Sequence, residues 1–177
     1  DFERFVEQIR YCYTNCGNTH IYIKIIDYMV QEPEQKARFL DKFGPICHSI
    51  AIEHLTPTIS EIDYDQLSGG MKTDQPQNGG VLLEGEVCPQ GFYMMQINPD
   101  GKVVPCCSMK YPAVLGDVTQ ASVPEVWRGT AFNQFRRRML TARSQASPVC
   151  QACSLFRYDL HPEDVLDGVR DELRVKY

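Results

Sequence analysis

Eight cysteines constrain what this 177-residue chain can fold into more than any other feature of its sequence. Four of them, in the second half of the chain, follow the patterns Cys88-x17-Cys106 and Cys150-x2-Cys153. A Cys-x2-Cys pair on a turn presents two thiolates to one metal centre, because the two-residue insert lets both sulfurs converge. A lone cysteine is most often a packed core thiol, but four in this arrangement predict a shared metal centre.

Composition favours this reading of the cysteines over disulfides. A chain of 177 residues with 43% hydrophobic content can build one compact domain or two small ones without cross-links. The net charge of -5 gives no global basic field, so neither nucleic acid nor an anionic membrane is expected as a partner. No apolar run approaches the roughly 20 residues of a membrane span, and the acidic start is not a secretory signal. We therefore expect a soluble, cytoplasmic protein whose thiols stay reduced.

The first 60 residues alternate between helical and strand patterns. Apolar residues spaced by three and four predict a helix over residues 2–16, and Pro33 opens a second helix that stops before residue 44. Residues 20–27 and 49–55 are rich in β-branched side chains, and the first of these runs reads as a strand buried on both faces. This order is typical of βα units around a parallel sheet, and it predicts an α/β fold.

The character of the sequence changes after Pro57. Residues 68–80 are rich in Gly, Gln and Asn and offer little to bury, which predicts a mobile linker at residues 61–83 between a domain at 1–60 and a second at 84–177. Within the second domain, residues 92–97 and 102–104 flank a turn of the sequence Asn-Pro-Asp-Gly and predict a β-hairpin. Further patterns predict a helix that opens at Ser122 and carries Val126, Trp127, Phe132, Phe135 and Met139, and a last helical stretch from Pro162 towards Leu173.

The hairpin is expected to supply two of the four metal ligands. Cys106 ends its second strand, while Cys88 lies a few residues before the first, where the following Pro and Gly can turn the chain back. Cys107 is the alternative to Cys106, because neighbouring strand residues point to opposite faces of a sheet. We assign the ligand to Cys106, and Cys88, Cys106, Cys150 and Cys153 are the predicted set.

The run Ile97 to Cys106, together with Cys88, the Gly-Asp-Val at 116–118 and the final Cys-x2-Cys pair, resembles the SPASM domain of radical SAM enzymes. The family's opening element, a cysteine, a spacer and then Gly-x4-Cys, is matched by Cys88, Gly101 and Cys106. The resemblance covers about residues 84–156. Residues 1–60 are similar to the closing half of a radical SAM barrel. Together, these two resemblances imply a partial parallel (β/α) half-barrel followed by a small α+β domain with a β-hairpin and helices around an iron–sulfur cluster.

The resemblance also implies which cluster the chain would hold. A full SPASM domain holds two auxiliary [4Fe–4S] clusters, but no cysteine occurs from Ser154 to Tyr177. The chain therefore resembles the shortened twitch form, in which one auxiliary [4Fe–4S] cluster has an electron-relay or architectural role. Such a role belongs to an enzyme that cleaves S-adenosylmethionine and acts on a small-molecule or peptide substrate.

The Cys-x3-Cys-x2-Cys motif that binds the catalytic cluster of that superfamily is absent. The nearest approach is Cys12-x3-Cys16-x2-Thr19, and both of its cysteines extend the apolar stripe of the first helix, so we assign them to the core. The chain therefore resembles the C-terminal part of a longer enzyme. Its partner would be the missing N-terminal radical SAM half, and alone it is expected to be inactive.

The same sequence is compatible with two other functions, and several other residues are candidates for a role in binding. The four thiolates could instead hold a structural zinc ion, or the chain could be a binding domain for a peptide or carrier without redox chemistry. Asp27 and His54 fall at strand carboxyl ends, where barrels place ligands, although exposure to solvent is the more frequent reason for such a residue. We expect Cys47 to be a packed thiol, the run 136–138 of three arginines to form a solvated helix face, and Trp127 with Phe132 and Phe135 to belong to the core.

Overall fold

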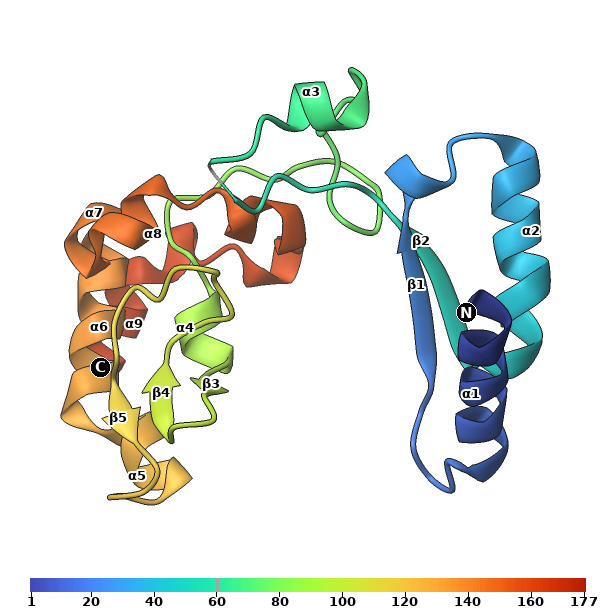
Figure 1. The fold of residues 1–177 in the computed structure, drawn as a ribbon. Helices are drawn as coiled ribbons and strands as arrows, with labels where there is room; N and C mark the ends of the chain where they lie inside the picture. The colour runs from blue at the N-terminus through green and yellow to red at the C-terminus, as the bar shows by residue number, and fades with distance from the viewer. Residues whose placement is uncertain (60) are drawn as a thin grey trace. The chain divides into compact units, whose positions relative to one another are not determined.

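The chain forms two compact units in the computed structural model, which describes residues 1–59 and 61–177. The first unit contains Asp1–Thr56 and Asp63–Gly80, and the second contains Pro57–Ile62 and Val81–Tyr177. Residue 60, where we expected the first domain to end, lies outside the described residues. Each unit has helices and strands of its own (Figure 1), so the predicted mixed α/β class is confirmed.

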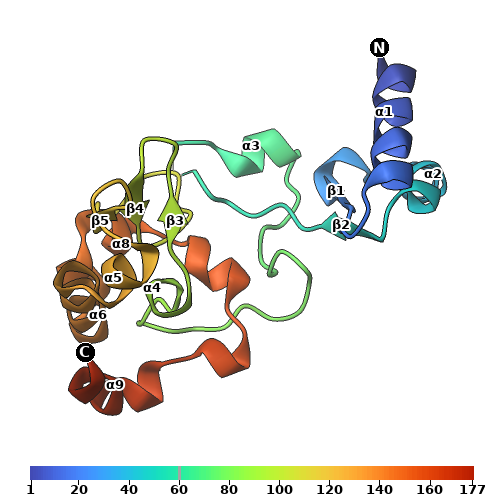
Figure 2. The same ribbon diagram turned by 90° about the horizontal axis from the view of Figure 1, so that it is seen from below.

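The first unit is built on two parallel strands, β1 (Tyr22–Ile26) and β2 (Ser49–Glu53). The connection between them runs through α2 (Pro33–Phe43), as the pattern of the sequence predicts. That helix and α1 (Phe2–Asn15) lie on the same side of the pair (Figures 1 and 2). A core cluster between the helices and the sheet contains Val6, Val30, Phe39, Phe43 and Ile46.

Local sequence explains where α2 begins and ends. Pro33 occupies the first turn, where a missing backbone N–H leaves no hydrogen bond unmade, and Glu32 and Gln35 form a reciprocal capping box. The helix ends at Gly44, where a 3-10 helix (Gly44–Ile46) leads into the second strand. Cys47 follows and is buried, so its predicted place in the core is confirmed.

Two predictions for the first unit are wrong. The strand β1 is not buried on both faces, because Tyr22 and Ile26 on the face away from the helices are exposed. Cys12 is exposed as well, and Cys16 is only half-buried. The apolar stripe of α1 is broad, but of its residues only Val6 is fully buried. The spacing of apolar residues therefore predicted more buried side chains on this helix than the structure contains.

The second unit contains a three-stranded antiparallel sheet in the order β3 (Gln96–Ile97), β4 (Lys102–Val104), β5 (Gly116–Asp117). The predicted hairpin is present as β3 and β4. Its first strand is shorter than expected, because Gln90–Tyr93 forms the short helix α4. The turn places Gly101 at a φ of 81°, a left-handed conformation that glycine adopts without strain.

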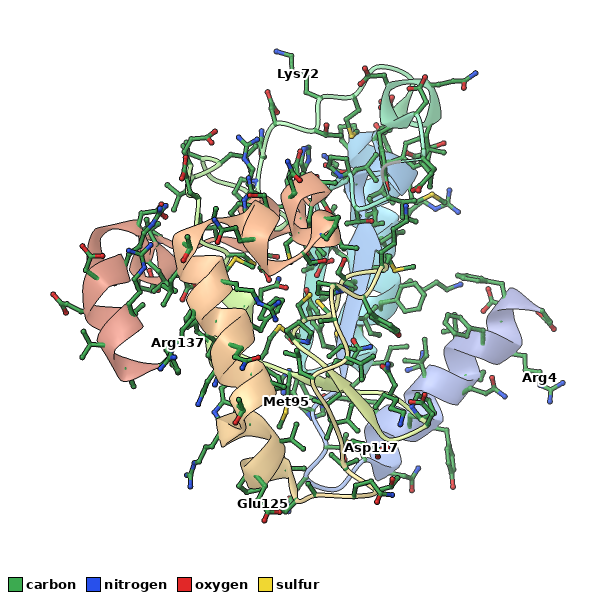
Figure 3. All side chains as sticks on the ribbon, turned by 90° about the vertical axis from the view of Figure 1, so that its left-hand side faces the viewer. Arg4, Lys72, Met95, Asp117, Glu125 and Arg137 are labelled. Carbon is green, nitrogen blue, oxygen red and sulfur yellow. The ribbon has the colours of Figure 1, made fainter. Side chains whose placement is uncertain are left out.

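The helix expected to open at Ser122 is two helices, α5 (Val123–Arg128) and α6 (Thr130–Thr141), because Gly129 has an extended backbone. Ser122 and Glu125 form a capping box at the start of α5, and Figure 3 labels Glu125 there. The core of this unit contains Val87, Val103, Leu115, Val126, Phe132, Phe135, Met139, Leu140 and Ala146.

The arginine run on α6 divides between two environments. Arg137, labelled in Figure 3, and Arg138 are exposed as predicted, but Arg136 is only 2% exposed and belongs to the interior. Trp127 is half-buried against the core that contains Phe132 and Phe135, which confirms the structural role expected for these three rings.

The remaining elements are short. The final stretch is helical only in part: it consists of 3-10 helices at Pro162–Asp164 and Asp167–Val169, followed by α9 (Arg170–Lys176). In the part of the chain that the structure describes, no helix has the length and apolar character needed to cross a membrane. The other short helices are α3 (Tyr64–Ser68), α7 (Arg143–Ala146), α8 (Pro148–Ala152) and 3-10 helices at Asp27–Met29 and Leu155–Asp159.

Candidate metal centre

The four predicted ligands come from three separate segments of the second unit. Cys88 lies two residues before α4, and Cys106 lies two residues after β4. Cys150 is part of α8, and Cys153 is the residue at which that helix ends. Pro148 and the Ser147 side chain, which accepts from the Val149 backbone N–H, fix the start of α8.

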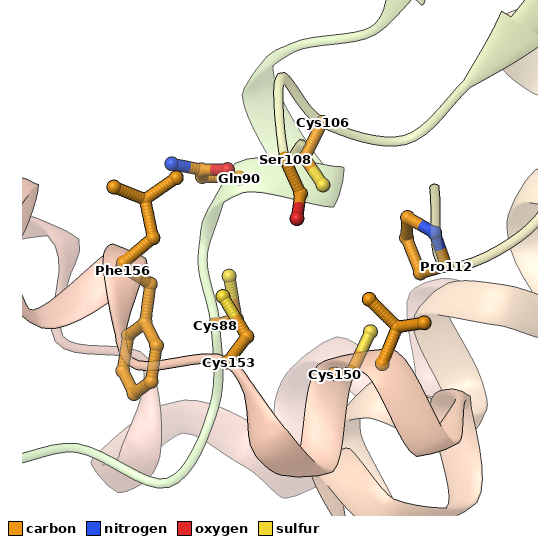
Figure 4. Close-up of a pocket in the computed structure, with 10 residues that line it drawn as sticks. Cys88, Gln90, Cys106, Ser108, Pro112, Cys150, Cys153 and Phe156 are labelled. Carbon is orange, nitrogen blue, oxygen red and sulfur yellow. The ribbon is translucent and has the colours of Figure 1, made fainter. Parts of the chain in front are cut away.

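All four cysteines line one cavity (Figure 4). The picture shows the sulfurs directed into the same space, with Cys106 entering from the strand side and Cys150 from the helix side. Val149, Pro112 and Phe156 supply apolar wall, and the polar groups at its edge are Gln90 and Ser108. The structure therefore brings together the residues that the spacing predicts as a set.

Burial and mutual repulsion act on these thiols in the absence of a cation. Burial, together with smaller contributions from Cys106, Cys153 and Cys150, raises the pKa of Cys88 to about 12. The pKa of Cys150 is raised to about 12 by burial and by Cys106 and Cys153. Burial likewise raises the pKa of Cys106. Such a group of thiolates is stable only when a bound metal compensates their charge.

Backbone N–H groups and one arginine add positive potential at the same place, and sequence reasoning missed them. The Gln90 and Ser108 backbone N–H groups donate to the sulfurs of Cys88 and Cys106 and lower their pKa values against the effect of burial. Arg143 donates from Nη1 to the Cys153 carbonyl oxygen at 3.0 Å. The sequence gives little indication of these backbone N–H groups, because any residue other than proline two positions after each cysteine carries one.

The donor set fits an iron–sulfur cluster. Four thiols surround about 350 Å³ of atom-free space, part of which is open to solvent. In residues 1–59 and 61–177, no three His, Cys, Asp or Glu side chains are gathered as the ligands of a single metal ion. A [4Fe–4S] cluster takes four thiolates, one at each iron, around a body larger than one ion.

The other four cysteines do not line this cavity. Cys107 is exposed although it follows a cavity residue directly. Cys12, Cys16 and Cys47 belong to the first unit. The structure therefore groups the eight cysteines into one set of four and four separate residues.

A second polar site occupies the carboxyl end of the parallel strands. His54 Nδ1 lies 2.6 Å from Asp27 Oδ2, and the other oxygen of Asp27 accepts from the Leu55 backbone N–H at 3.0 Å. The pair is mostly buried, and His54 Nε2 has no hydrogen-bond partner within the described residues. These residues are therefore not simply turned towards solvent, which was the more frequent alternative.

Beside that pair, the Glu53 carboxylate binds three further side chains. It is 5% exposed and accepts from Tyr22 at 2.9 Å, from Gln77 at 2.5 Å and from Lys24 at 2.8 Å. Burial raises the pKa of Glu53, but these hydrogen bonds outweigh it and the net pKa is lowered. The carboxylate is thus held ionised on the face of the sheet opposite α1 and α2.

Comparison with known proteins supports the cysteine site. Residues 88–154 match the family model described as SPASM, an iron–sulfur cluster-binding domain. The match begins at the first predicted ligand and includes all four. Searches of curated proteins and of solved structures gave no significant match. The SPASM resemblance of this part of the chain is therefore confirmed, and with it the expectation of iron–sulfur binding.

Proposed function

We propose that the second unit holds one auxiliary [4Fe–4S] cluster through Cys88, Cys106, Cys150 and Cys153, with an electron-relay or architectural role in a radical SAM enzyme. The observation that carries this proposal is the convergence of four cysteines from three segments on one cavity, within residues that match an iron–sulfur domain. When bound, such a cluster supplies one-electron exchange.

The residues of the chain would hold, shield and tune that centre. The four thiolates would occupy one external site on each iron, so that no iron stays open to a substrate. Val149, Leu155 and Phe156 would limit the access of water. The Gln90 and Ser108 backbone N–H groups hydrogen-bond two of the sulfurs, and such bonds raise the reduction potential of a cluster.

The first unit fits the role of the closing half of a radical SAM barrel. Its parallel β1–β2 pair has both helices on one side and carries Asp27, Glu53 and His54 on or beside the side opposite those helices. In a complete barrel that side would face the cavity for S-adenosylmethionine or for a small-molecule or peptide substrate. The N-terminal half with Cys-x3-Cys-x2-Cys would then be the partner of this chain.

The setting proposed for this enzyme is the cytoplasm, without nucleic acid or membrane as partners. Thiols that must bind iron stay reduced in that compartment. The net charge of -5 offers no general attraction to polyanions.

A redox measurement separates this function from its two rivals, a zinc module and a peptide-binding or carrier-binding domain without redox chemistry. Anaerobically prepared protein should absorb visible light, bleach when dithionite is added and recover its absorbance on reoxidation. Zinc has no redox chemistry in proteins and would give no such change. A colourless protein that binds zinc, or a coloured one that dithionite leaves unchanged, would exclude electron relay.

A further inference from the structure

The second unit has another pocket, which shares no lining residue with the cysteine cavity. It is lined by residues of α4, α5, α6 and α9, including the rings of Phe92, Trp127 and Tyr177. Three cationic side chains also line it: Arg128, Arg136 and Lys176. No Asp or Glu side chain lines it. On a chain with a net charge of -5, a pocket with this charge requires an explanation.

Arg136 lines the pocket and is almost completely buried, with 2% of its surface exposed. Its Nε donates to the Gly91 carbonyl oxygen at 3.0 Å. Its Nη1 donates to the carbonyl oxygen of Trp127 at 2.9 Å and to the side-chain oxygen of Asn133 at 3.0 Å. The other terminal nitrogen, Nη2, is buried and has no hydrogen-bond partner among the described residues.

Aromatic rings hold the guanidinium in place. Its carbon lies 4.1 Å from the centre of the Trp127 ring and 4.9 Å from the centres of the Phe132 and Tyr177 rings. Such contacts stabilise a cation but accept no hydrogen bond in the plane of the guanidinium. They therefore account for the position of Arg136 and leave Nη2 with two unused donors.

The positive charge in the pocket is not neutralised by the protein. In the part of the chain that the structure describes, no acidic group lies within ion-pair distance of Arg128, Arg136 or Lys176, whereas Arg157, Arg170 and Arg174 each have a carboxylate partner. Burial lowers the pKa of Arg136, as expected for a cation removed from water, and the opposing effect of Tyr177 is smaller. An unpaired buried charge of this kind is unfavourable unless a ligand compensates it.

We propose that this pocket binds the oxyanion group, phosphate or carboxylate, of a small ligand. Arg136 Nη2 would donate to the oxyanion from the interior, and the exposed side chains of Arg128 and Lys176 would add charge at the rim. The rings of Phe92 and Trp127 offer apolar surface to the body of the ligand. Guanidinium groups donate to both oxyanions with the same geometry, so the structure defines the shared chemistry and titration distinguishes the two.

The chain carries its own reporter of binding, because Trp127 is the only tryptophan and contacts Arg136. We would titrate the folded protein with inorganic phosphate and, separately, with acetate, and hold the ionic strength constant with chloride. The tryptophan fluorescence should change saturably with at least one of the two. The anion that saturates identifies the class of ligand. A version extended beyond Tyr177 by a few Gly and Ser residues tests whether a terminal carboxylate competes.

Rim variants make the test specific, because exposed residues can be changed without disturbing the core. Arg128→Gln and Lys176→Gln should each weaken the binding by about fivefold. Arg137→Gln removes the same charge from an exposed position on α6 outside the pocket and should leave the affinity unchanged. Arg136→Lys, if circular dichroism shows it folded, should weaken binding more than either rim variant, because a lysine cannot keep the Gly91 and Asn133 hydrogen bonds and also reach the ligand.

Two results would overturn the proposal. One is the absence of saturation with both anions in the millimolar range. The other is saturation with the same affinity in the rim variants and in Arg137→Gln, which would show general charge screening. Neither result bears on the cluster, because the two cavities have no residue in common.

Discussion

Cys106 and Cys107 are neighbours in the chain, yet Cys106 lines the cavity with three other cysteines and Cys107 is exposed. The sequence alone allowed either to be the ligand, because both follow the second strand of the hairpin. The structure gives them different roles. It also provides a matched pair of variants, since each loses one thiol from the same loop.

We expect Cys106→Ser to lose or destabilise the cluster and Cys107→Ser to retain it. A serine oxygen is a poor substitute for thiolate at iron, and the three remaining ligands would hold the cluster weakly. Iron content and visible absorbance of anaerobically purified proteins measure the difference. Cys88→Ser, Cys150→Ser and Cys153→Ser should behave like Cys106→Ser, and changes at Cys12, Cys16 or Cys47 should have no effect. Loss of iron in Cys107→Ser with retention in Cys106→Ser would reverse the assignment.

Gly116 on β5 should not tolerate a side chain. A Cβ atom built on Gly116 lies 2.3 Å from Val126 Cγ1, and Val126 is buried on α5. Because Val126 is packed in the core and Gly116 is held by the pairing of β5 with β4, Gly116→Ala should lower the free energy of unfolding by about 1–3 kcal/mol. Gly168→Ala is the matched control, since a Cβ there meets no atom within 4 Å. Equal thermal unfolding midpoints for the two variants would contradict the packing described for this sheet.

Asp117 should titrate far below an ordinary aspartate. Lys102 Nζ lies 2.6 Å from its Oδ2, and the Thr119 hydroxyl and backbone N–H donate to its Oδ1. These hydrogen bonds lower the pKa of Asp117 from 3.8 to about 2. The carboxyl ¹³C shift, followed by NMR against pH, should show this midpoint. A midpoint near 3.8 would mean that the contact with Lys102 is not maintained in solution.

The same shift sets the sign of the effect of pH on stability. A lowered pKa in the folded state adds stability at pH values above about 3.8, and this contribution is lost as the pH falls towards about 2. Asp117→Asn should therefore be less stable than the unchanged protein near neutral pH, and the difference should vanish at the acid end of that range. Asp171→Asn, which removes an exposed carboxylate of the same unit, should show no comparable difference.

Reductive cleavage of S-adenosylmethionine should not occur with this chain alone. In the radical SAM enzymes to which we propose that this chain belongs, three cysteines in Cys-x3-Cys-x2-Cys leave one iron open, and the chain contains no such motif. We would incubate reconstituted, reduced protein with the cofactor and assay 5′-deoxyadenosine by chromatography. Turnover that disappears in Cys12→Ala or Cys16→Ala would show that the thiols in and directly after α1 form a second cluster site.

Local signals were sufficient to predict much of the fold and the composition of the cysteine site. Pro33, Ser122 and the Asn-Pro-Asp-Gly turn act on their immediate neighbours, so the elements that they begin or connect are found close to the expected positions. The spacing of the cysteines similarly indicated a common centre, because metal ligation depends on few residue types. How the loops orient each sulfur is a property of the folded chain.

Residues whose environment depends on distant segments could not be predicted in the same way. Three consecutive arginines predict a solvated helix face, but the main-chain oxygen of Gly91 and the ring of Tyr177, both distant in the sequence, surround Arg136 in the folded chain. The break between α5 and α6 lies at Gly129, and the five-residue interval from Trp127 to Phe132 departs from the helical spacing of three or four, but a single glycine does not by itself end a helix. The pairing of Asp27 with His54 joins the ends of two strands, and only the parallel register brings them together.

The metal content of anaerobically prepared protein tests the central claim most directly. Four thiolates around one cavity predict about four iron atoms and four acid-labile sulfides per chain. Preparation must exclude oxygen, because thiolates and inorganic sulfide oxidise in air. Iron and sulfide near this ratio, lost in Cys106→Ser and retained in Cys107→Ser, are the predicted result. One equivalent of zinc without sulfide, even after anaerobic reconstitution with iron and sulfide, would contradict the account.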